Sequence, residues 1–474
     1  MLCRTQRSFI RKKGGGLLRL KLIFARLEQR RKPDRAARVL MGFFLLVIAL
    51  GSILLALPAS SRNGESCGAM TAVFTATSAT CVTGLSLVDS YTQWSALGQC
   101  VLLGLIQIGG LGYMAFVSVF YFVLRRRIGL RERLVLQQAM ALDELAGVVR
   151  LVRLMLLGTF LVEGTGALIL TARFWMEYPL KKALWMGVFH SISAFCNAGF
   201  DILGFLQPGA SLAAFKGDTV INLTLLALIV IGGLGFFVWN DLLMWKKNHR
   251  LSVHTRLVLW TTGILLVGGT LAILALEWNN PGTLGSMPAG KKLLAAFFQA
   301  GTTRTAGFAA VNQGSLTGSG KLVSILLMLV GGSSGSTAGG IKTVSVALLF
   351  LMSCSVLRNR REVTLFGRRI AQEQISSAAS IALLVTGLGL LGAVILSATN
   401  ALPLGDCLYE SVSAICTVGL STGITAGLNL GSKLLLIVYM FFGRVGIMTI
   451  SFAFMTKTPP DHAIRRPVAR VLIG

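Results

Sequence analysis

Four short segments of the chain repeat one pattern, in which small and hydroxyl-bearing residues lead to a glycine and then an apolar residue. They read SATCVTGL, SAFCNAGF, GTTRTAGF and SAICTVGL, and their glycines are Gly84, Gly199, Gly307 and Gly419. These glycines lie 115, 108 and 112 residues apart, so the pattern divides almost the whole chain into four equivalent parts. Four short backbone loops around one axis could replace the hydration shell of a small cation with carbonyl oxygens. We call these segments the motif loops and predict that they form a four-fold cation site.

The predicted chemistry of the motif loops is mainly that of the backbone. Carbonyl oxygens from residues 80–83, 195–198, 303–306 and 415–418 would face the cation, and each glycine would permit an extended turn that a side chain hinders. Each loop has one glycine where the K⁺-channel signature has two, so we expect fewer well-formed sites and looser discrimination against sodium. Arg304 and Asn197 differ from their counterparts in the other loops, and we expect Arg304 to support its loop from behind. The candidate K⁺ ligands are Thr80, Cys81, Val82, Thr83, Gly84, Cys196, Asn197, Ala198, Gly199, Thr303, Thr305, Ala306, Gly307, Cys416, Thr417, Val418 and Gly419.

The composition places these loops in a membrane. The chain has 474 residues, of which 54% are apolar and 13% charged, and its mean hydropathy is +0.73. It is therefore too hydrophobic for a soluble globule and is predicted to be a polytopic membrane protein. The eight cysteines form no CxxC pair, so neither a disulfide framework nor a zinc site is indicated.

The net charge of +27 is an orientation signal rather than a sign of nucleic-acid binding. Basic residues cluster before Val39 and within residues 125–133, 246–250, 358–369 and 457–470, whereas the connections between these clusters hold only single residues or pairs. The positive-inside rule then places both termini in the cytoplasm. The basic arm at the N-terminus is interpreted as a surface attracted to anionic lipid, with contact to a cytoplasmic partner as the alternative. No cleavage site follows a short apolar core, so we do not predict a removed signal peptide.

Eight apolar spans are predicted, in four pairs that each enclose a motif loop. A short amphipathic stretch precedes each motif loop and is too short to cross a bilayer, so a re-entrant helix that lines a cavity is expected there. Because the basic connections all return to one side, the four units are predicted to be parallel. The predicted spans are Val39–Leu57, Leu97–Leu124, Val148–Ala172, Thr219–Trp245, Arg256–Leu276, Lys321–Leu357, Ile375–Ser397 and Ser432–Met455. The predicted divisions are a basic arm at 1–38, repeats at 39–124, 125–245, 246–357 and 358–457, and a cytoplasmic tail at 458–474.

The second span of each pair contains a glycine-rich point. Residues 108–112 and 231–235 both read IGGLG, which we interpret as sites of close helix packing. The third such stretch has ten residues none of which is larger than threonine, and a stable helix is not expected there. It is predicted to break the span, to lie beneath the motif loops and to act as a gate. This candidate gate comprises Gly331, Gly332, Ser333, Ser334, Gly335, Ser336, Thr337, Ala338, Gly339 and Gly340, together with Arg444.

Two cationic side chains accompany this candidate gate. Arg444 lies between the glycines of the fourth stretch, GRVG, in an apolar span, and we expect it to face the same aqueous path. The alternative, that Arg444 extends to the membrane interface, is disfavoured by its distance from both ends of the span. Lys342, just beyond the stretch, either contributes electrostatically or extends to the interface.

At these residues the chain resembles the TrkH/TrkG/KtrB superfamily of potassium uptake proteins, from Val39 onward. The resemblance rests on TATSATCVTGLS, FHSISAFCNAGFD, GTTRTAGF, YESVSAICTVGLS, the Gly/Ser stretch before Ile341, FFGRVG and the final Leu472–Gly474. With eight spans, the chain is most similar to the KtrB branch, also called sodium-ATPase subunit J. The resemblance implies an all-α polytopic membrane protein with four parallel helix, pore-loop, helix repeats around one ion pore.

The same resemblance implies partners and a location. It implies a homodimer in the bacterial inner membrane, a cytosolic ring of nucleotide-binding RCK subunits similar to KtrA, and potassium transport that is activated by sodium. No GxGxxG with a soluble Rossmann pattern occurs in the chain, so such a ring would be a separate polypeptide. No organic cofactor and no nucleic acid are expected.

Two other classes of protein were considered. An enzyme would need converging titratable groups, but the four histidines are scattered, no HExxH or GxSxG occurs, and His190 occupies the place of Glu410 and is expected to pack behind its motif loop. A secondary transporter coupled to sodium or protons would need intramembrane carboxylates. The candidates Glu163 and Asp241 are few and are expected near span ends. Ion-coupled transport therefore stays open as the alternative.

Overall fold

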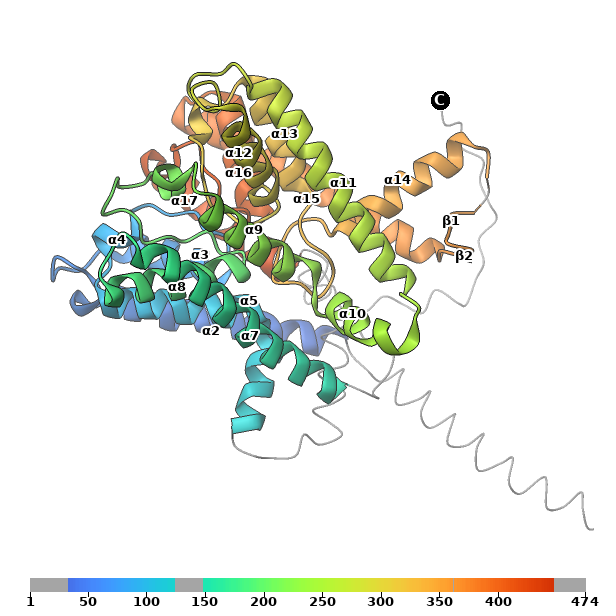
Figure 1. The fold of residues 1–474 in the computed structure, drawn as a ribbon, viewed down its shortest axis with the longest axis horizontal. Helices are drawn as coiled ribbons and strands as arrows, with labels where there is room; N and C mark the ends of the chain where they lie inside the picture. The colour runs from blue at the N-terminus through green and yellow to red at the C-terminus, as the bar shows by residue number, and fades with distance from the viewer. Residues whose placement is uncertain (1–32, 124–147, 361, 447–474) are drawn as a thin grey trace, which may run out of the picture. The chain divides into compact units, whose positions relative to one another are not determined.

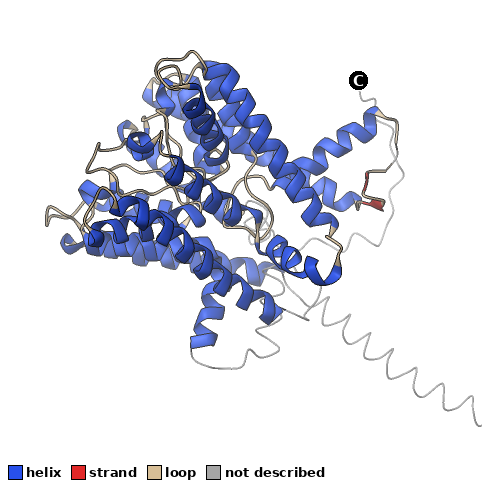
Figure 2. Cartoon of the chain, in the orientation of Figure 1, coloured by secondary structure: helices blue, strands red, loops and turns tan. Residues whose placement is uncertain are grey.

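The computed structural model describes residues 33–123, 148–360 and 362–446. Figure 2 shows that helices make up most of this part of the chain. The predictions for the basic arm before residue 33, for the basic connection 124–147 and for the tail lie outside the described residues. One compact unit begins at Gly42 and contains every element that follows the first helix. The fold is that of an all-α polytopic membrane protein.

Within residues 33–123, 148–360 and 362–446, four long helices are apolar enough to cross a bilayer. They correspond to the first span of each predicted pair, and their window hydropathies lie between 1.7 and 2.8. Large apolar side chains such as Leu161 and Leu168, which are 71% and 70% exposed on the second of these helices, give this helix a surface suited to lipid. The four helices are α2 (Pro33–Ala56), α7 (Val148–Trp175), α11 (Val253–Glu277) and α15 (Gln372–Asn400) (Figure 1).

The second span of each predicted pair is interrupted at or near its glycine-rich point, whereas a break was predicted only for the third. Within α5 (Ala96–Val123), Gly112 has a φ of 75° and kinks the helix. Gly235, with a φ of 89°, separates α9 (Thr219–Leu234) from α10 (Phe236–Asn248), and the two helices meet at 93°. Glycine adopts positive φ without steric cost, which explains why the interruptions fall there.

The other two second spans also stop at glycine. The third is divided into α13 (Gly318–Leu329) and α14 (Thr343–Leu357), with the predicted break between them. In the fourth span, α17 (Leu430–Val445) ends at Gly446, whose φ is 92°. The interpretation of the IGGLG stretches as packing sites is thus incomplete, because each also ends a helical segment.

Each motif loop follows directly from a short helix of 12 to 16 residues, as predicted. These motif helices are α3 (Ala69–Thr80), α8 (Leu180–Phe195), α12 (Ala289–Thr302) and α16 (Leu404–Ile415). Three of them pack against the long helix before them, α8 on α7, α12 on α11 and α16 on α15, while α3 packs on α5. The smaller elements are α4 (Ser90–Gln93), the 3-10 helices η1 (Pro58–Ser60), η2 (Ser211–Phe215), η3 (Gln313–Ser315) and η4 (Thr425–Gly427), and the hairpin of β1 (Thr364–Leu365) and β2 (Arg368–Arg369).

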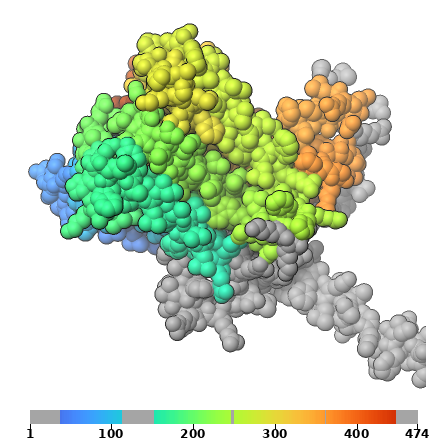
Figure 3. Space-filling view, in the orientation of Figure 1, coloured from blue at the N-terminus to red at the C-terminus, as the bar shows by residue number. Residues whose placement is uncertain are grey.

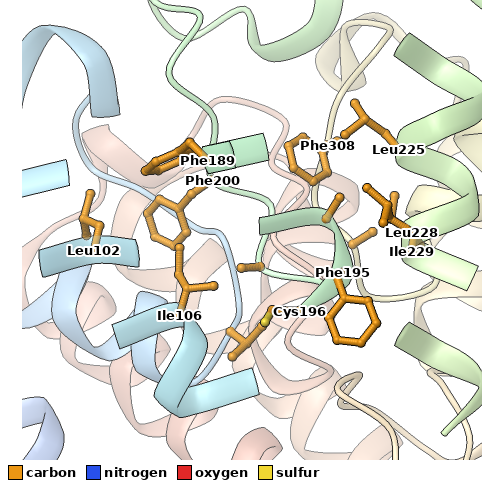
Figure 4. Packing of buried hydrophobic residues seen from close by; sticks show 14 of the residues in the cluster. Leu102, Ile106, Phe189, Phe195, Cys196, Phe200, Leu225, Leu228, Ile229 and Phe308 are labelled. Atoms are coloured by element: carbon orange, nitrogen blue, oxygen red, sulfur yellow. The ribbon is translucent and has the colours of Figure 1, made fainter. Parts of the chain in front are cut away.

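The hydrophobic core surrounds the motif helices. Each motif helix carries a completely buried aromatic side chain nine or ten residues before its motif glycine: Phe74, Phe189, Phe298 and Tyr409. Figure 4 shows Phe189 among the apolar side chains of this core, close to Phe200. In the space-filling view, the segments coloured green to yellow form one closely packed face (Figure 3). Close van der Waals packing of these rings fixes the motif helices and hence the loops that follow them.

Candidate functional site: a closed ring of motif loops

The four motif glycines lie against one another in chain order. A Cβ atom added to any one of them would collide with the carbonyl oxygen of the residue that precedes the next motif glycine. The series closes, because Gly419 faces the carbonyl of Thr83, which precedes Gly84. The distances from such a Cβ to the facing oxygen are 2.6 Å for Gly84 and Ala198, 2.9 Å for Gly199 and Ala306, and 2.8 Å for Gly307 and Val418. Backbone loops from four distant parts of the sequence therefore form one ring.

Each motif loop contains two residues in the left-handed region. The glycines have φ values of 95°, 68°, 79° and 90°, in chain order. The residue two places earlier is also left-handed: Val82 (56°), Asn197 (58°), Thr305 (68°) and Thr417 (52°). A non-glycine residue pays roughly 1–2 kcal/mol for this conformation, and β-branched valine and threonine are unusual there. Four equivalent strained positions indicate that packing around the ring imposes the backbone path.

Hydroxyl groups of the motif helices fasten the motif loops. The amide of Gly84 donates to Ser78 Oγ at 3.0 Å, and that of Gly419 donates to Ser413 Oγ at 3.1 Å. In the other two loops the hydroxyl is the donor: Ser193 Oγ to the carbonyl of Phe200 and Thr302 Oγ1 to that of Phe308, both at 2.7 Å. Sequence reasoning did not include these residues in the candidate site. The available signal was a serine or threonine five or six residues before each motif glycine.

Several side-chain oxygens in the ring are buried without a hydrogen-bond partner. Within the described residues, these include the hydroxyls of Thr80, Thr83, Thr305 and Thr417 and the amide oxygen of Asn197. Buried polar atoms are usually satisfied, so a group of unsatisfied oxygens marks a place that can accept a cation or water. In the part of the chain that the structure covers, no three His, Cys, Asp or Glu side chains gather to hold a metal ion. The donor set of the ring is thus neutral oxygen, the kind that suits a weakly held monovalent cation.

The stretch from Gly331 to Gly340, which we call the glycine loop, forms a closed backbone loop beside the ring. Its base is fastened where Gly331 N donates to Ile341 O at 2.9 Å and Thr343 N donates to Gly332 O at 3.1 Å. It also joins the break between α9 and α10, where Phe236 N donates to Gly335 O at 3.0 Å. These bonds replace the helical bonds that ten small residues do not sustain.

The glycine loop touches two of the motif loops. Thr337 Oγ1 donates to the carbonyl of Phe195 and accepts from Asn197 Nδ2, each at 3.1 Å. Gly339 lies so close to Thr417 that a Cβ atom there would overlap the threonine hydroxyl. The glycine loop and the motif loops are therefore in direct contact, while the predicted role of this segment as a gate stays a prediction.

Three cationic side chains hold carbonyl groups of the glycine loop. Arg444 donates to the carbonyl of Thr337 and to those of Gly109 and Gly110 in α5, the last at 3.0 Å. Lys342 Nζ donates to Ala338 O at 2.8 Å, and Arg304 donates to Gly331 O at 3.4 Å. Arg444 and Lys342 thus bind backbone inside the fold rather than extending to an interface. Arg304 supports the glycine loop, a contact that its spacing did not reveal; that it also supports its own motif loop stays a prediction.

His190 and Glu410, which occupy equivalent places in the second and fourth motif helices, are both buried. His190 is buried among Phe174, Phe189 and Phe308, with Nδ1 2.7 Å from the carbonyl of Met186, which fits the expected packing role. Glu410 is also fully buried and accepts from Thr425 Oγ1.

The two candidate carboxylates of the spans differ in position. Asp241 lies on α10, beyond the break in its span, and accepts from Ser252 N at 2.9 Å. Glu163 was expected near a span end, and this expectation is wrong: it lies in the middle of α7 and is only 4% exposed.

Long apolar helices around a closed ring of backbone carbonyls define a multi-pass membrane protein whose site suits ion passage rather than enzymatic chemistry. Residues 23–466 match the model of the TrkH family, described as cation transport protein. The chain belongs to this family of transporters and is not an enzyme. The family resemblance predicted from the motif loops is confirmed.

Named relatives cover nearly the whole chain. It is 39% identical to the Ktr system potassium uptake protein B of Bacillus subtilis, over 92% of this chain and 95% of that protein. It is 35% identical to the potassium/sodium uptake protein NtpJ of Enterococcus hirae, over 95% and 99% respectively. The crystal structure of the potassium transporter TrkH from Vibrio parahaemolyticus aligns with a TM-score of 0.66 at 17% identity, over 88% of this chain and 85% of that one. The fold is shared with that transporter.

Proposed function

We propose that this chain is the potassium-translocating subunit of a Ktr-type uptake system, with the ring of motif loops as its selectivity filter. The observation that carries the proposal is the closed ring, in which each motif glycine faces the carbonyl of the next loop. The names of two relatives that cover nearly the whole chain, which describe potassium and potassium/sodium uptake, support potassium as the cargo.

In this mechanism a potassium ion sheds water as carbonyl oxygens of the four motif loops replace its hydration shell. The bonds from Ser78 and Ser413 to the glycine amides hold the ring open against collapse around a smaller ion. Discrimination between potassium and a smaller ion then depends on how firmly the motif loops are held. The strained residues two places before each glycine contribute, because the packing that imposes their conformation also fixes the backbone of the loop.

The glycine loop and Arg444 are proposed to form the gate below the filter. The guanidinium repels an arriving cation, and two unit charges 4 Å apart interact by about 4 kcal/mol at an effective dielectric constant of 20. Opening requires the glycine loop to release its bonds to Phe195, Asn197 and Arg444. Since α14 follows the glycine loop directly, a pull on α14 would move the gate.

The regulation proposed here follows the family resemblance. The subunit would form a homodimer in the bacterial inner membrane, with both termini in the cytoplasm, and would bind a separate KtrA-like RCK ring that responds to nucleotides. The basic hairpin of β1 and β2, which links α14 to α15, is a suitable docking surface because it continues directly from α14. Sodium is proposed as an activator of transport.

A second candidate function is transport coupled to sodium or protons. The observation in its favour is Glu163, a carboxylate buried in the middle of a membrane-spanning helix. A coupled carrier would accumulate potassium against its electrochemical gradient, and flux would follow the gradient of the coupling ion.

Potassium uptake in cells that lack their own importers tests the proposal. The chain is expressed with a matching RCK ring, and uptake is measured with increasing external sodium. We expect saturable potassium uptake, and a Gly84→Ser variant that admits sodium or loses affinity. Absence of potassium uptake in cells that also contain the RCK ring would refute potassium transport.

A further inference from the structure

Glu163 lies at the centre of a buried polar cluster behind the second motif loop. Gln107 Nε2 lies 3.2 Å from each carboxylate oxygen, and the Cys196 thiol lies 3.8 Å from Oε1 and 3.7 Å from the Gln107 side-chain oxygen. Figure 4 shows Cys196 at the C-terminal end of α8, next to Phe195 and close to the α5 turn that carries Ile106. Ser191 Oγ also donates to the backbone carbonyl of Glu163 at 2.6 Å.

This carboxylate is unusual among the long helices. The other three carry acidic residues only near their ends, at Asp34, Glu277 and Glu373. Within the described residues, Glu163 forms no ion pair with Lys, Arg or His. Burial of a carboxyl group without a cationic partner is costly, so its presence in the middle of α7 indicates a functional role.

The contacts of Glu163 belong to a closed circuit that joins the filter to the gate. On one side, Cys196 begins the second motif loop, and its neighbour Asn197 donates to Thr337 of the glycine loop. Thr337 is held in turn by Arg444. On the other side, Gln107 precedes by two residues the carbonyl of Gly109, which also accepts from Arg444.

The circuit joins the Glu163 side chain to Arg444 through Cys196 and the residue that follows it. The Cys196 thiol lies 3.8 Å from Glu163 Oε1, and Asn197 donates to Thr337, whose carbonyl accepts from Arg444. Close packing holds Cys196 there, because a Cβ atom on Gly110 would lie 2.5 Å from its sulfur. A change at Glu163 is thus transmitted to the motif loop through Cys196 and to the anchor of Arg444 through α5.

We propose that Glu163 is a positioning residue that keeps the second motif loop and α5 in register with the glycine loop, and so sets both cation selectivity and the closed state of the gate. The proposal rests on the proposed function of the ring and the glycine loop. A carboxylate accepts from the Gln107 amide and the Cys196 thiol together, since both its oxygens are acceptors. A glutamine at position 163 replaces one of these oxygens by an NH₂ group, so the Gln107 amide, which lies 3.2 Å from both oxygens, faces a second donor.

The test compares Glu163→Gln with a swapped pair, Gln107→Glu with Glu163→Gln. The swap returns one carboxylate and one amide to the same two positions. Glu177→Gln is the matched control, because Glu177 lies just beyond the end of the same helix in an exposed pair with Arg173. Each variant is measured for protein amount, for KM and maximal rate of potassium uptake, and for potassium-to-sodium selectivity, with the RCK ring present and absent.

We expect Glu163→Gln to raise KM for potassium by about five- to tenfold, as for loss of one net hydrogen bond. It should also lower selectivity and raise leak when the RCK ring is absent. The swapped pair should recover at least half of each change, and the control should match the wild type. Gln107→Leu, which keeps the carboxylate and removes its donor, should shift KM and selectivity in the same direction.

Three outcomes would overturn the proposal. The first is an unchanged KM and selectivity in Glu163→Gln at normal protein amount. The second is an equal loss of potassium affinity and selectivity in Glu163→Gln and in the swapped pair, together with an unchanged KM in Gln107→Leu. This combination would indicate a purely structural role for Glu163. The third is loss of uphill accumulation with retained selectivity, which identifies an ion-coupling site instead. Failure of the proposed function itself is distinguishable, because the wild type would then transport no potassium.

Discussion

A single methyl group added at Gly84 is expected to disturb ion selection far more than folding. Alanine at a φ of 95° is strained by roughly 1–2 kcal/mol. Its Cβ would lie 2.6 Å from the carbonyl oxygen of Ala198, so one of the two loops must move. If the strain of roughly 1–2 kcal/mol displaces the carbonyl ligands of the ring, the affinity for potassium falls by a factor of about 5 to 30.

The assay for this prediction is potassium uptake over a range of concentrations, with and without competing sodium, at equal amounts of protein in the membrane. Gly104→Ala is the matched control: it lies in α5, is helical, and has no atom within 4 Å of an added Cβ. The control should leave uptake unchanged and stabilise the helix by up to about 1 kcal/mol. Full affinity and selectivity in Gly84→Ala would refute the inference that the ring of glycines contacts the ion path.

Three further variants test neighbouring contacts. Arg444→Ala should raise flux and reduce dependence on the RCK ring, as measured by uptake with and without that ring; unchanged gating would contradict a role in closure. Ser413→Ala leaves the Gly419 amide without its acceptor, and a buried unsatisfied group costs roughly 1–3 kcal/mol, so selectivity should decline. Ser380→Ala is the control, because Ser380 is exposed on α15 and its hydroxyl bonds only within its own helix. Thr337→Val removes both hydrogen bonds to the second motif loop without changing shape, and should increase leak in single-channel or flux recordings, whereas a tighter gate would show the opposite role.

Spacing in the sequence was sufficient to predict which residues form the ring. The glycines recur at nearly constant intervals, and a short helix must precede each of them because the apolar stretch there is too short to cross a bilayer. The break at residues 331–340 followed from composition, since small residues cannot sustain a helix. The motif glycines, the short helices before them and the break at residues 331–340 could be predicted because each depends on the residue types within one short segment.

Contacts between distant segments could not be predicted in the same way. The bonds of Arg444 to Gly109 and Gly110 join residues more than 330 positions apart, and nothing in either stretch specifies the other. The left-handed conformation of Val82 and Thr417 runs against the preference of β-branched residues, so sequence propensity argued for a different backbone. The burial of Glu163 could not be predicted, because burial depends on what packs against a helix, and Cys196 and Gln107 reach it from other segments.

A ring assembled from one polypeptide has a stoichiometry that a ring of identical subunits lacks. In a homotetramer one codon change alters four ligands at once, and co-expression with the wild-type subunit yields a mixture of heterotetramers. Here Val82, Asn197, Thr305 and Thr417 occupy equivalent places yet are encoded separately. Each quarter of the ring is free to diverge, and a laboratory series can exchange one, two, three or four of them and read selectivity as a graded function of the number changed.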